Sequence, residues 1–374
     1  MRQLLSLFAL VMLMSAPSLL CAQVAALSID AGENDFAVVA YYSGDANEVD
    51  KYPVTKLTHI IYSFLHLQGN RLAVDNAEDD STIKHLVLLK EKYPRLKVML
   101  ALGGWGGCRT CSEVFSNPPA RSEFAQSVKA LLAAYRADGV DLDWEYPAIE
   151  GYPEHSYLLE DKQNFTSLVR ELRETLGEQY EVSFAAGGFL EYLAKSVEWE
   201  KVVPMVNRVN LMSYDLVNGY SKVTGHHSPL SSSPDQKESI RTAVQFLDSL
   251  NIPLNKIAIG AAFYARVWAN VDDKNNGLYQ AGTFRDFVNY KDFEAYFAAT
   301  DGFQEHFDRA ADAYYRYSPQ KKLFATFDNP ESVKSKTRYA LEQGLGGVMF
   351  WQLAADKYRD GLLDAIAEAV KADQ

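Results

Sequence analysis

The sequence predicts an α/β protein built as a (β/α)8 barrel, with a small α+β insertion between its seventh and eighth strands. Eight short β-rich apolar runs recur along the chain with amphipathic segments between them. The 374 residues exceed the roughly 250 of a plain barrel. The interval between the seventh and eighth runs is much longer than the other intervals. A doubly wound open sheet is disfavoured because no glycine-rich phosphate loop follows the first run.

The strand–helix alternation predicts parallel pairing with right-handed crossovers. The predicted strands are 36–43, 57–64, 97–102, 139–144, 181–186, 208–214, 256–263 and 346–351. Helices are predicted where apolar residues share one helical face, at 124–135 and at 165–176, the second ending at Gly177. A further helix is predicted to start at 233–236, where a Ser cap is followed by Pro and then by Gln.

The long interval, residues 267–323, is dense in Tyr, Phe and Asp. It includes the segment 277–284 and the amphipathic segment 290–297. So many aromatic residues argue against a disordered loop, because disordered segments are poor in them. We expect a small α+β subdomain that forms one wall of a cleft, set into a barrel that occupies residues 23–374.

The first residues predict a secretory signal over 1–22. Arg2 precedes the apolar run 4–14, which is shorter than the roughly 18 residues of a spanning helix. Lipid attachment at Cys21 is an alternative, although Leu20 is not the small residue that it prefers, and a non-cleaved anchor is another. We expect an exported protein, secreted or periplasmic, with no membrane span.

Beyond Cys21, the remaining cysteines are Cys108 and Cys111, in a C-x-x-C spacing. In an exported protein this spacing favours a local disulfide. A redox motif would need a thioredoxin-like context, and a zinc site would need a second pair of ligands, neither of which the sequence offers.

Composition excludes some classes of function. Hydrophobic residues make up 48% and charged residues 23%, which excludes global disorder. The 37 basic and 49 acidic residues give a net charge of −12, which disfavours nucleic acid as the partner. The aromatic content of 12% would serve either a core or a groove for neutral sugar rings. We expect a monomer acting on a neutral ligand, with neither cofactor nor metal.

The segment 138–147, DGVDLDWEYP, carries the chemistry. Alternate side chains of a strand share a face, so Asp141, Asp143 and Glu145 are predicted to point together into the barrel. The opposite, helix-facing side would carry Val140, Leu142 and Trp144. Three inward acids are not expected from stability alone, because barrel interiors are packed with branched apolar residues.

Mutual repulsion gives such a cluster a use. At about 6 Å and an effective dielectric near 20, one pair costs roughly 2–3 kcal/mol, or about two pKa units. Crowding and burial therefore keep one acid protonated, as a general acid requires. Glu145, the outermost, is the predicted acid, Asp143 shares its proton or binds substrate, and Asp141 supplies charge behind both. A metal cage and a solvated acidic edge are the alternatives, and the EF-hand pattern is absent.

The acidic run and the Tyr-Pro that follows it resemble glycoside hydrolase family 18, and specifically its chitinase branch. The resemblance extends over nearly the whole predicted mature chain. Further similar segments are 102–105, 212–215, 260–266, 327–336 and 346–351. Ala101, Ala262 and Ala265 depart from the family's pattern, which commonly has Ser, Pro and Gly there.

The resemblance implies a retaining mechanism in which the substrate's own 2-acetamido oxygen is the nucleophile. Glu145 would protonate the leaving oxygen and later activate water, and Asp143 would bind the acetamido N–H. Tyr214 would hold the acetamido carbonyl, with Asp215 beside it. The substrate-binding residues implied are Gly104, Trp105, Tyr146, Met212, Tyr264, Arg266 and Trp351, the last under the distorted sugar.

Several of these residues have structural alternatives. Trp105 and Trp351 could be core aromatics, Tyr214 could plug the barrel, and Asp215 could be an acid paired with Arg266. The adjacent residues 226–227, both His, are assigned no chemistry, because such pairs more often lie at the surface or anchor a loop.

The predicted function is an exported chitinase that cuts β-1,4-linked N-acetylglucosamine polymers or oligomers with retention. Chitin or its oligosaccharides would be the partner. An endo-β-N-acetylglucosaminidase acting on N-glycans and a non-catalytic, lectin-like chitin-binding protein are the alternatives.

Overall fold

The computed structural model describes residues 36–373, with the side chain of Ala299 excepted. The predicted signal segment and Cys21 lie outside the described residues. No helix within the described range has the length and apolar character needed to cross a membrane.

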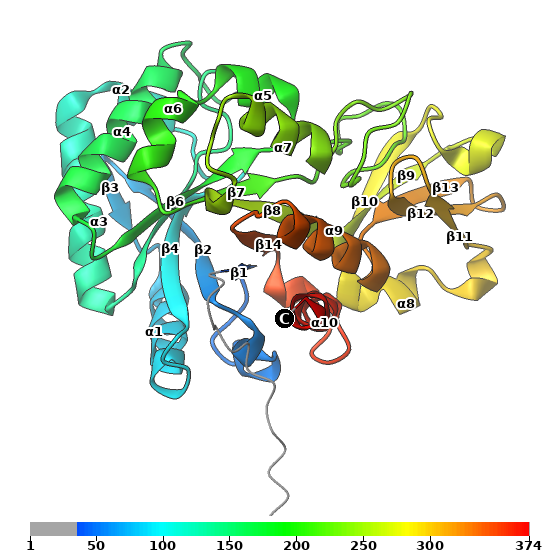
Figure 1. Ribbon diagram of the computed structural model, residues 1–374, viewed down its shortest axis with the longest axis horizontal. Coiled ribbons are helices and arrows are strands. Elements are labelled where there is room, and N and C mark those ends of the chain that lie inside the picture. The colour runs from blue at the N-terminus through cyan, green and yellow to red at the C-terminus, as the bar shows by residue number, and fades with distance from the viewer. Residues whose placement is uncertain (1–35, 374) are drawn as a thin grey trace, which may run out of the picture.

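Eight parallel strands close into a barrel (Figure 1). In barrel order they run β1, β14, β8, β7, β6, β5, β4 and β2, and β2 pairs with β1 to complete the circle. Their bounds are β1 (Ala37–Tyr42), β2 (His59–Gln68), β4 (Lys97–Gly103), β5 (Gly139–Asp143), β6 (Glu181–Gly187), β7 (Arg208–Met212), β8 (Ile257–Ala262) and β14 (Gly347–Trp351). The short β3 (Arg71–Ala73) pairs antiparallel with the end of β2. The predicted fold class is confirmed.

Helices cover the outside of the barrel (Figure 1). They are α1 (Ala77–Lys92), α2 (Cys111–Ser116), α3 (Pro118–Tyr135), α4 (Asp161–Leu176), α5 (Leu190–Lys195), α6 (Trp199–Val202), α7 (Ile240–Ser249), α9 (Pro330–Glu342) and α10 (Leu362–Ala372). Short 3-10 turns lie at Val49–Lys51, Val54–Lys56, Val203–Met205, Leu254–Lys256, Lys274–Gly277, Tyr290–Asp292, Ala299–Asp301 and Leu353–Ala355. The predicted helical faces at 124–135 and 165–176 fall within α3 and α4, and Gly177 ends α4 with φ 69°.

The helix start predicted at 233–236 is wrong. α7 begins at Ile240, and its cap is Ser239, whose side chain accepts a hydrogen bond from the Thr242 amide. The amide of Gln236 does donate to Ser233 Oγ, at 3.1 Å, but the chain turns there without entering a helix. The Gln236 side chain instead bonds the backbone N–H and C=O of His226, so it anchors a loop.

A second sheet of five antiparallel strands lies at one side of the barrel and is formed by the segment of the chain that follows β8 and precedes α9 (Figure 1). Its order is β10, β9, β13, β12 and β11. The bounds are β9 (Tyr264–Ala269), β10 (Thr283–Asn289), β11 (Gln304–Asp308), β12 (Ala313–Ser318) and β13 (Leu323–Phe327), and α8 (Phe293–Tyr296) follows β10. The sheet extends beyond the expected range 267–323 at both ends. β9 starts two residues after β8 ends, and β13 continues to Phe327.

The pleat of β5 separates its acids from its apolar side chains. Val140 and Leu142 belong to the large apolar cluster that the helices share, which includes Phe124 of α3 and Phe165 of α4. A smaller cluster inside the barrel draws on several strands and comprises Ala37, Val39, Tyr41, Ile61, Met99, Ala101, Ala185, Ala258 and Met349. The acids of β5 therefore lie on the side away from the helices.

Gly103 and Gly104 bring the end of β4 against the end of β5. Gly103 has φ +111°, and a Cβ there would lie 2.3 Å from the Asp143 carbonyl oxygen. The Gly104 amide donates to that same oxygen, at 3.0 Å. Glycine is required because any side chain would force the two strand ends apart.

We expect Gly103→Ala to destabilise the fold by about 3 kcal/mol, since it adds a backbone clash to an unfavourable φ. The matched control is Gly344→Ala. Gly344 also has a positive φ, of +67°, but beyond Gly344 itself and its two chain neighbours no described atom lies within 4 Å of the position that a Cβ would take there. That control should lose only about 1 kcal/mol. Urea unfolding of both variants measures the difference, and equal losses would contradict the packing argument.

Candidate active site

Asp141 is the innermost acid and is fully buried. Three side chains donate hydrogen bonds to its carboxylate: Tyr41 Oη at 2.9 Å, Ser183 Oγ at 2.5 Å and Asn210 Nδ2 at 3.0 Å. Burial raises the pKa of Asp141, and these hydrogen bonds oppose the rise. The donors come from β1, β6 and β7 and were missed by the sequence analysis. The signal in the sequence that could have identified them is a polar side chain at an inward position of an otherwise apolar strand.

Asp143 lies at the end of β5 and is 3% exposed. Burial is the main cause that raises its pKa well above the usual value, and the charges of Glu145 and Asp141 add to it. Its Oδ1 is buried and has no hydrogen-bond partner within residues 36–373. A buried carboxylate oxygen without a donor costs stability, so packing alone does not explain it. Because no group in the described part of the chain donates to Asp143 Oδ1, this atom can accept a hydrogen bond from a ligand.

Glu145 is placed by a turn and not by the strand, which corrects the prediction from alternation. β5 ends at Asp143, and Glu145 has φ 67°, in the left-handed region. The Tyr146 amide donates to the Trp144 carbonyl, at 2.9 Å, which closes a three-residue turn centred on Glu145. Trp144 remains on the helix side, buried against Phe115. A strained backbone at a titratable residue is typical of functional sites.

The pKa of Glu145 is raised to about 8, chiefly by burial and secondly by the negative charge of Asp215. This carboxyl is therefore mostly protonated at neutral pH and can donate a proton. Its side chain is still partly exposed. The charge of Glu145 raises the pKa of Asp143, and the charge of Asp215 raises the pKa of Glu145, so the structure brings these three acids close enough to act on one another.

Asp215 is held by a bidentate ion pair with Arg266. Arg266 Nε donates to Oδ1 at 2.8 Å and Nη2 donates to Oδ2 at 2.5 Å. His227 Nδ1 lies 3.6 Å from Oδ1. Burial would raise the pKa of Asp215, but His227 and Arg266 together hold it below its usual range. Asp215 therefore has the partner that was weighed as its structural alternative, and it also acts on Glu145.

Tyr214, Met212 and Trp351 contact the inner barrel cluster and are each partly exposed. Trp351 stacks on Phe64, with ring centroids 5.4 Å apart and an angle of 13° between the planes. Tyr214 Oη lies 3.8 Å from Met349 Sδ. A Cβ at Gly104 would lie 2.5 Å from the ring of Phe64, so Gly104 leaves the room that this stack needs.

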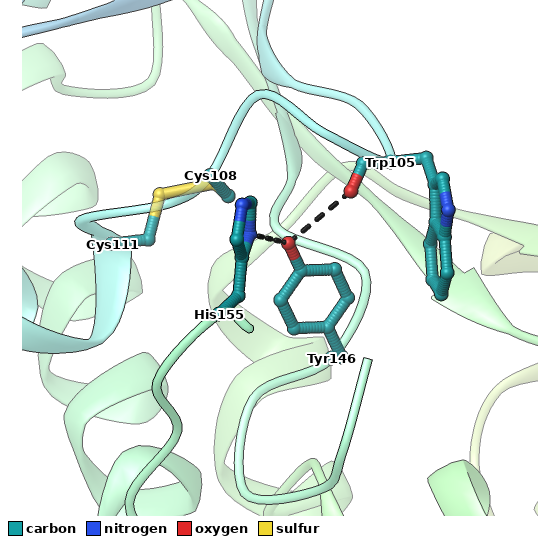
Figure 2. Close-up of a disulfide and its surroundings, with 5 residues drawn as sticks. All are labelled: Trp105, Cys108, Cys111, Tyr146 and His155. Atoms are coloured by element: carbon teal, nitrogen blue, oxygen red, sulfur yellow. Dashed lines mark hydrogen bonds between the residues drawn. A yellow bond between two sulfur atoms is a disulfide. The ribbon is translucent and has the colours of Figure 1, made fainter. Parts of the chain in front are cut away.

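Trp105 is 41% exposed and lies on the loop after β4. Tyr146, which was expected to bind substrate, is only 2% exposed and meets Trp105 edge-on at 5.6 Å. Figure 2 shows the Tyr146 hydroxyl between the Trp105 carbonyl oxygen, 3.3 Å away, and His155 Nδ1, 2.6 Å away. A disulfide joins Cys108 of the same loop to Cys111, the first residue of α2 (Figure 2). Tyr146 therefore supports Trp105 without offering a surface of its own.

Tyr264 is likewise buried, at 1% exposed, although it was expected to bind substrate. Phe287 of β10 stacks on it at 4.5 Å and is itself 44% exposed. The guanidinium of Arg266 lies 5.5 Å from both rings. Phe287 was not among the residues predicted from the sequence, where its signal was its place in the long interval dense in Tyr and Phe.

The two adjacent histidines are fully buried, so of the two positions expected for them the surface is wrong, while the anchoring of a loop holds for His226. His226 Nε2 lies 3.0 Å from Asp308 Oδ2, in the second sheet, and anchors the loop there. His227 faces the Asp215 carboxylate. No group of three or more His, Cys, Asp or Glu side chains within the described part of the chain could hold a metal ion.

Comparison with known proteins places this geometry in context. The family model described as "Glycosyl hydrolases family 18" matches residues 37–356. Chitinase A1 of Niallia circulans is 32% identical over 303 residues, which cover 74% of this chain and 43% of that protein. Chitinase B of Serratia marcescens is 27% identical over 88% of this chain and 83% of its own length. The structure of a glycoside hydrolase family 18 N-acetylglucosaminidase from Paenibacillus barengoltzii superimposes with TM-score 0.81, at 32% identity, over 89% of this chain and 99% of that one.

Proposed function

Because the chain belongs to glycoside hydrolase family 18, we propose that it is a chitinase that hydrolyses β-1,4-linked N-acetylglucosamine oligomers or polymers with retention. The observation that carries the proposal is Glu145, a carboxyl with a pKa of about 8 beside the unpartnered Oδ1 of Asp143. The names of the relatives support chitin as the substrate class.

In the proposed first step, Glu145 donates its proton to the leaving glycosidic oxygen as the bond to the anomeric carbon breaks. The substrate's acetamido oxygen attacks the anomeric carbon from the opposite face and forms an oxazolinium ion. Glu145, now ionised, removes a proton from water, which attacks the anomeric carbon and restores the acetamido group. Two displacements at one carbon retain the β configuration.

Asp143 would accept a hydrogen bond from the acetamido N–H through the free Oδ1 and stabilise the positive charge of the oxazolinium ring. Tyr214 would orient the acetamido carbonyl. Trp351 would lie beneath the distorted sugar, and the exposed ring of Trp105 would stack on a neighbouring unit. In this scheme Asp141 does not contact the substrate. It stays buried behind Asp143, held by its three hydrogen bonds.

The product pattern is a second question, on which one comparison bears. The Paenibacillus barengoltzii N-acetylglucosaminidase matches over nearly its full length, which favours release of single sugar units as a candidate activity. Hydrolysis of a chromogenic chitobioside, followed by product analysis on chitin tetramer, tests both. Disaccharide as the main early product supports the chitinase, and monosaccharide alone supports the second candidate. Glycan release from a high-mannose glycoprotein, without chitin cleavage, would contradict both.

We also propose that the protein acts outside the cytoplasm as a monomer, on chitin or its soluble oligosaccharides. The basic and then apolar segment at 2–14 supports export. Cleavage near Ala22 is proposed over lipid attachment at Cys21.

The raised pKa of Glu145 predicts the alkaline limit of activity. A general acid must be protonated, so kcat/KM should fall as the pH rises through about 8. Because the charge of Asp215 contributes to the rise, Asp215→Asn should move this limb to lower pH by about one unit. Asp360→Asn is the control, since Asp360 is exposed and also has a positive φ. The pH profile of kcat/KM measures the shift, and an unmoved limb would contradict this account of the Glu145 pKa.

A further inference from the structure

The neighbouring histidines 226 and 227 are equally buried but face different parts of the molecule. His226 is directed to the second sheet, where Asp308 lies 3.0 Å from its Nε2 and Tyr315 packs edge-on at 5.7 Å. His227 is directed to the barrel mouth, where Asp215 lies 3.6 Å from its Nδ1. One member of the pair therefore offers a natural control for the other.

Neither ring nitrogen of His227 forms a hydrogen bond with a side-chain or backbone atom of residues 36–373. An imidazole buried in this way costs stability, so packing alone is a poor reason for its presence. An apolar residue of similar volume would fill the same space at lower cost. Its nearest acidic group is the carboxylate that acts on Glu145.

The charged and titratable groups around His227 come from several elements. Asp215 follows β7, and Tyr264 and Arg266 lie on β9. Asp328, after β13, also acts on the ring electrostatically. The Asp328 carboxylate already binds Lys336 Nζ at 2.6 Å, and its charge is therefore balanced within the barrel wall. Asp215 is the acid whose ionisation His227 can influence most directly.

We propose that His227 is a positioning residue of the active site: its imidazole takes up a proton in acid and, with Arg266, keeps the Asp215 carboxylate ionised. The inference rests on the proposed function, because it is through Asp215 that His227 acts on the acid Glu145. The proton comes from solvent, and no bond to the substrate is involved.

The electrostatic balance agrees with this assignment. Burial lowers the pKa of His227, while Asp215 and Asp328 act in the opposite direction. The ring is thus neutral near pH 7 and takes a proton only in acid. His227 in turn contributes to the lowered pKa of Asp215, so its removal raises that pKa. The proposed role requires an ionised Asp215 carboxylate, so the acid limb of activity, where this carboxylate takes up a proton, should move to higher pH. The alkaline limb, which Glu145 sets, should stay, because Asp215 is ionised there with or without His227.

The test is the pH profile of kcat/KM on a chromogenic chitobioside for the wild type, His227→Leu, His227→Asn and the control His226→Leu. We expect His227→Leu to raise the acid limb by about one pH unit, and His227→Asn, which keeps a polar group but cannot become charged, by about half of that. His226→Leu should leave both limbs in place. In an Asp215→Asn background, His227→Leu should produce no further shift.

An acid limb that stays in place in both His227 variants, or that moves equally in His226→Leu, would overturn the assignment while leaving the proposed hydrolysis intact. If His227→Leu does not fold, His227→Asn decides alone. If the wild type fails to hydrolyse the chitobioside, the proposed function is wrong. The ionisation of Asp215 is then measured through the free energy of unfolding as a function of pH. A depressed Asp pKa gives stability that is lost as the pH falls from the pKa of the unfolded state to that of the folded state. In the His227 variants this loss should be smaller and should end at higher pH; an identical pH dependence would refute the role.

Discussion

Glu145→Gln is expected to lower kcat by about a thousandfold while sugar binding and the fold are retained. The amide keeps the size of the side chain, so the turn at Glu145 and the packing of Trp144 should persist. The variant cannot donate a proton to the leaving oxygen or take one from water. Steady-state hydrolysis of a chitobioside gives kcat, and calorimetric titration with chitin tetramer gives the binding constant.

The matched control is Glu154→Gln. Glu154 lies on the same loop, is exposed and has the same φ of 67°. Its variant should keep kcat within about twofold of the wild type, as surface substitutions usually do. If Glu145→Gln hydrolysed chitin oligomers at the wild-type rate, the assignment of the general acid would be wrong.

Asp143→Asn is expected to lower kcat by about a hundredfold, comparable to the loss of one electrostatic contact to a developing charge. The change removes the carboxyl group that, once ionised in the transition state, would stabilise the oxazolinium ring. Its effect should be on kcat more than on KM, because the charge develops only in the transition state. Rates on a chitobioside with a good leaving group should show the same loss, since acetamido attack is needed there too.

Asp138→Asn serves as the control for that variant. Asp138 immediately precedes β5 and pairs with Lys90 Nζ at 2.7 Å, at the opposite end of the strand from Asp143. Its variant should lose some stability but keep kcat. A full rate in Asp143→Asn, or an equal loss in both variants, would show that Asp143 has no special part in the chemistry.

Local pattern was enough to predict the barrel. Each of the eight predicted strands overlaps a strand of the structure, because period and composition reflect burial on both faces of a parallel sheet. The pleat likewise placed Asp141 and Asp143 on one side and Val140 and Leu142 on the other.

What the sequence could not supply depends on residues that are distant in the chain. The turn at Glu145 interrupts the alternation, and the end of the strand is seen only in the backbone of the folded chain, where Glu145 has a positive φ. The partners of Asp141 come from three other strands, and Tyr41 is 100 residues away. The burial of His227 follows from contact with β9 and β13, to which no local pattern points.

The most direct test of the account is the anomeric form of the first product, followed by NMR during hydrolysis of chitin tetramer by the wild-type protein. Substrate-assisted catalysis through Glu145 and Asp143 predicts that the new reducing ends appear first as the β anomer and reach the α–β equilibrium only later, by mutarotation. New reducing ends that appear first as the α anomer would contradict it.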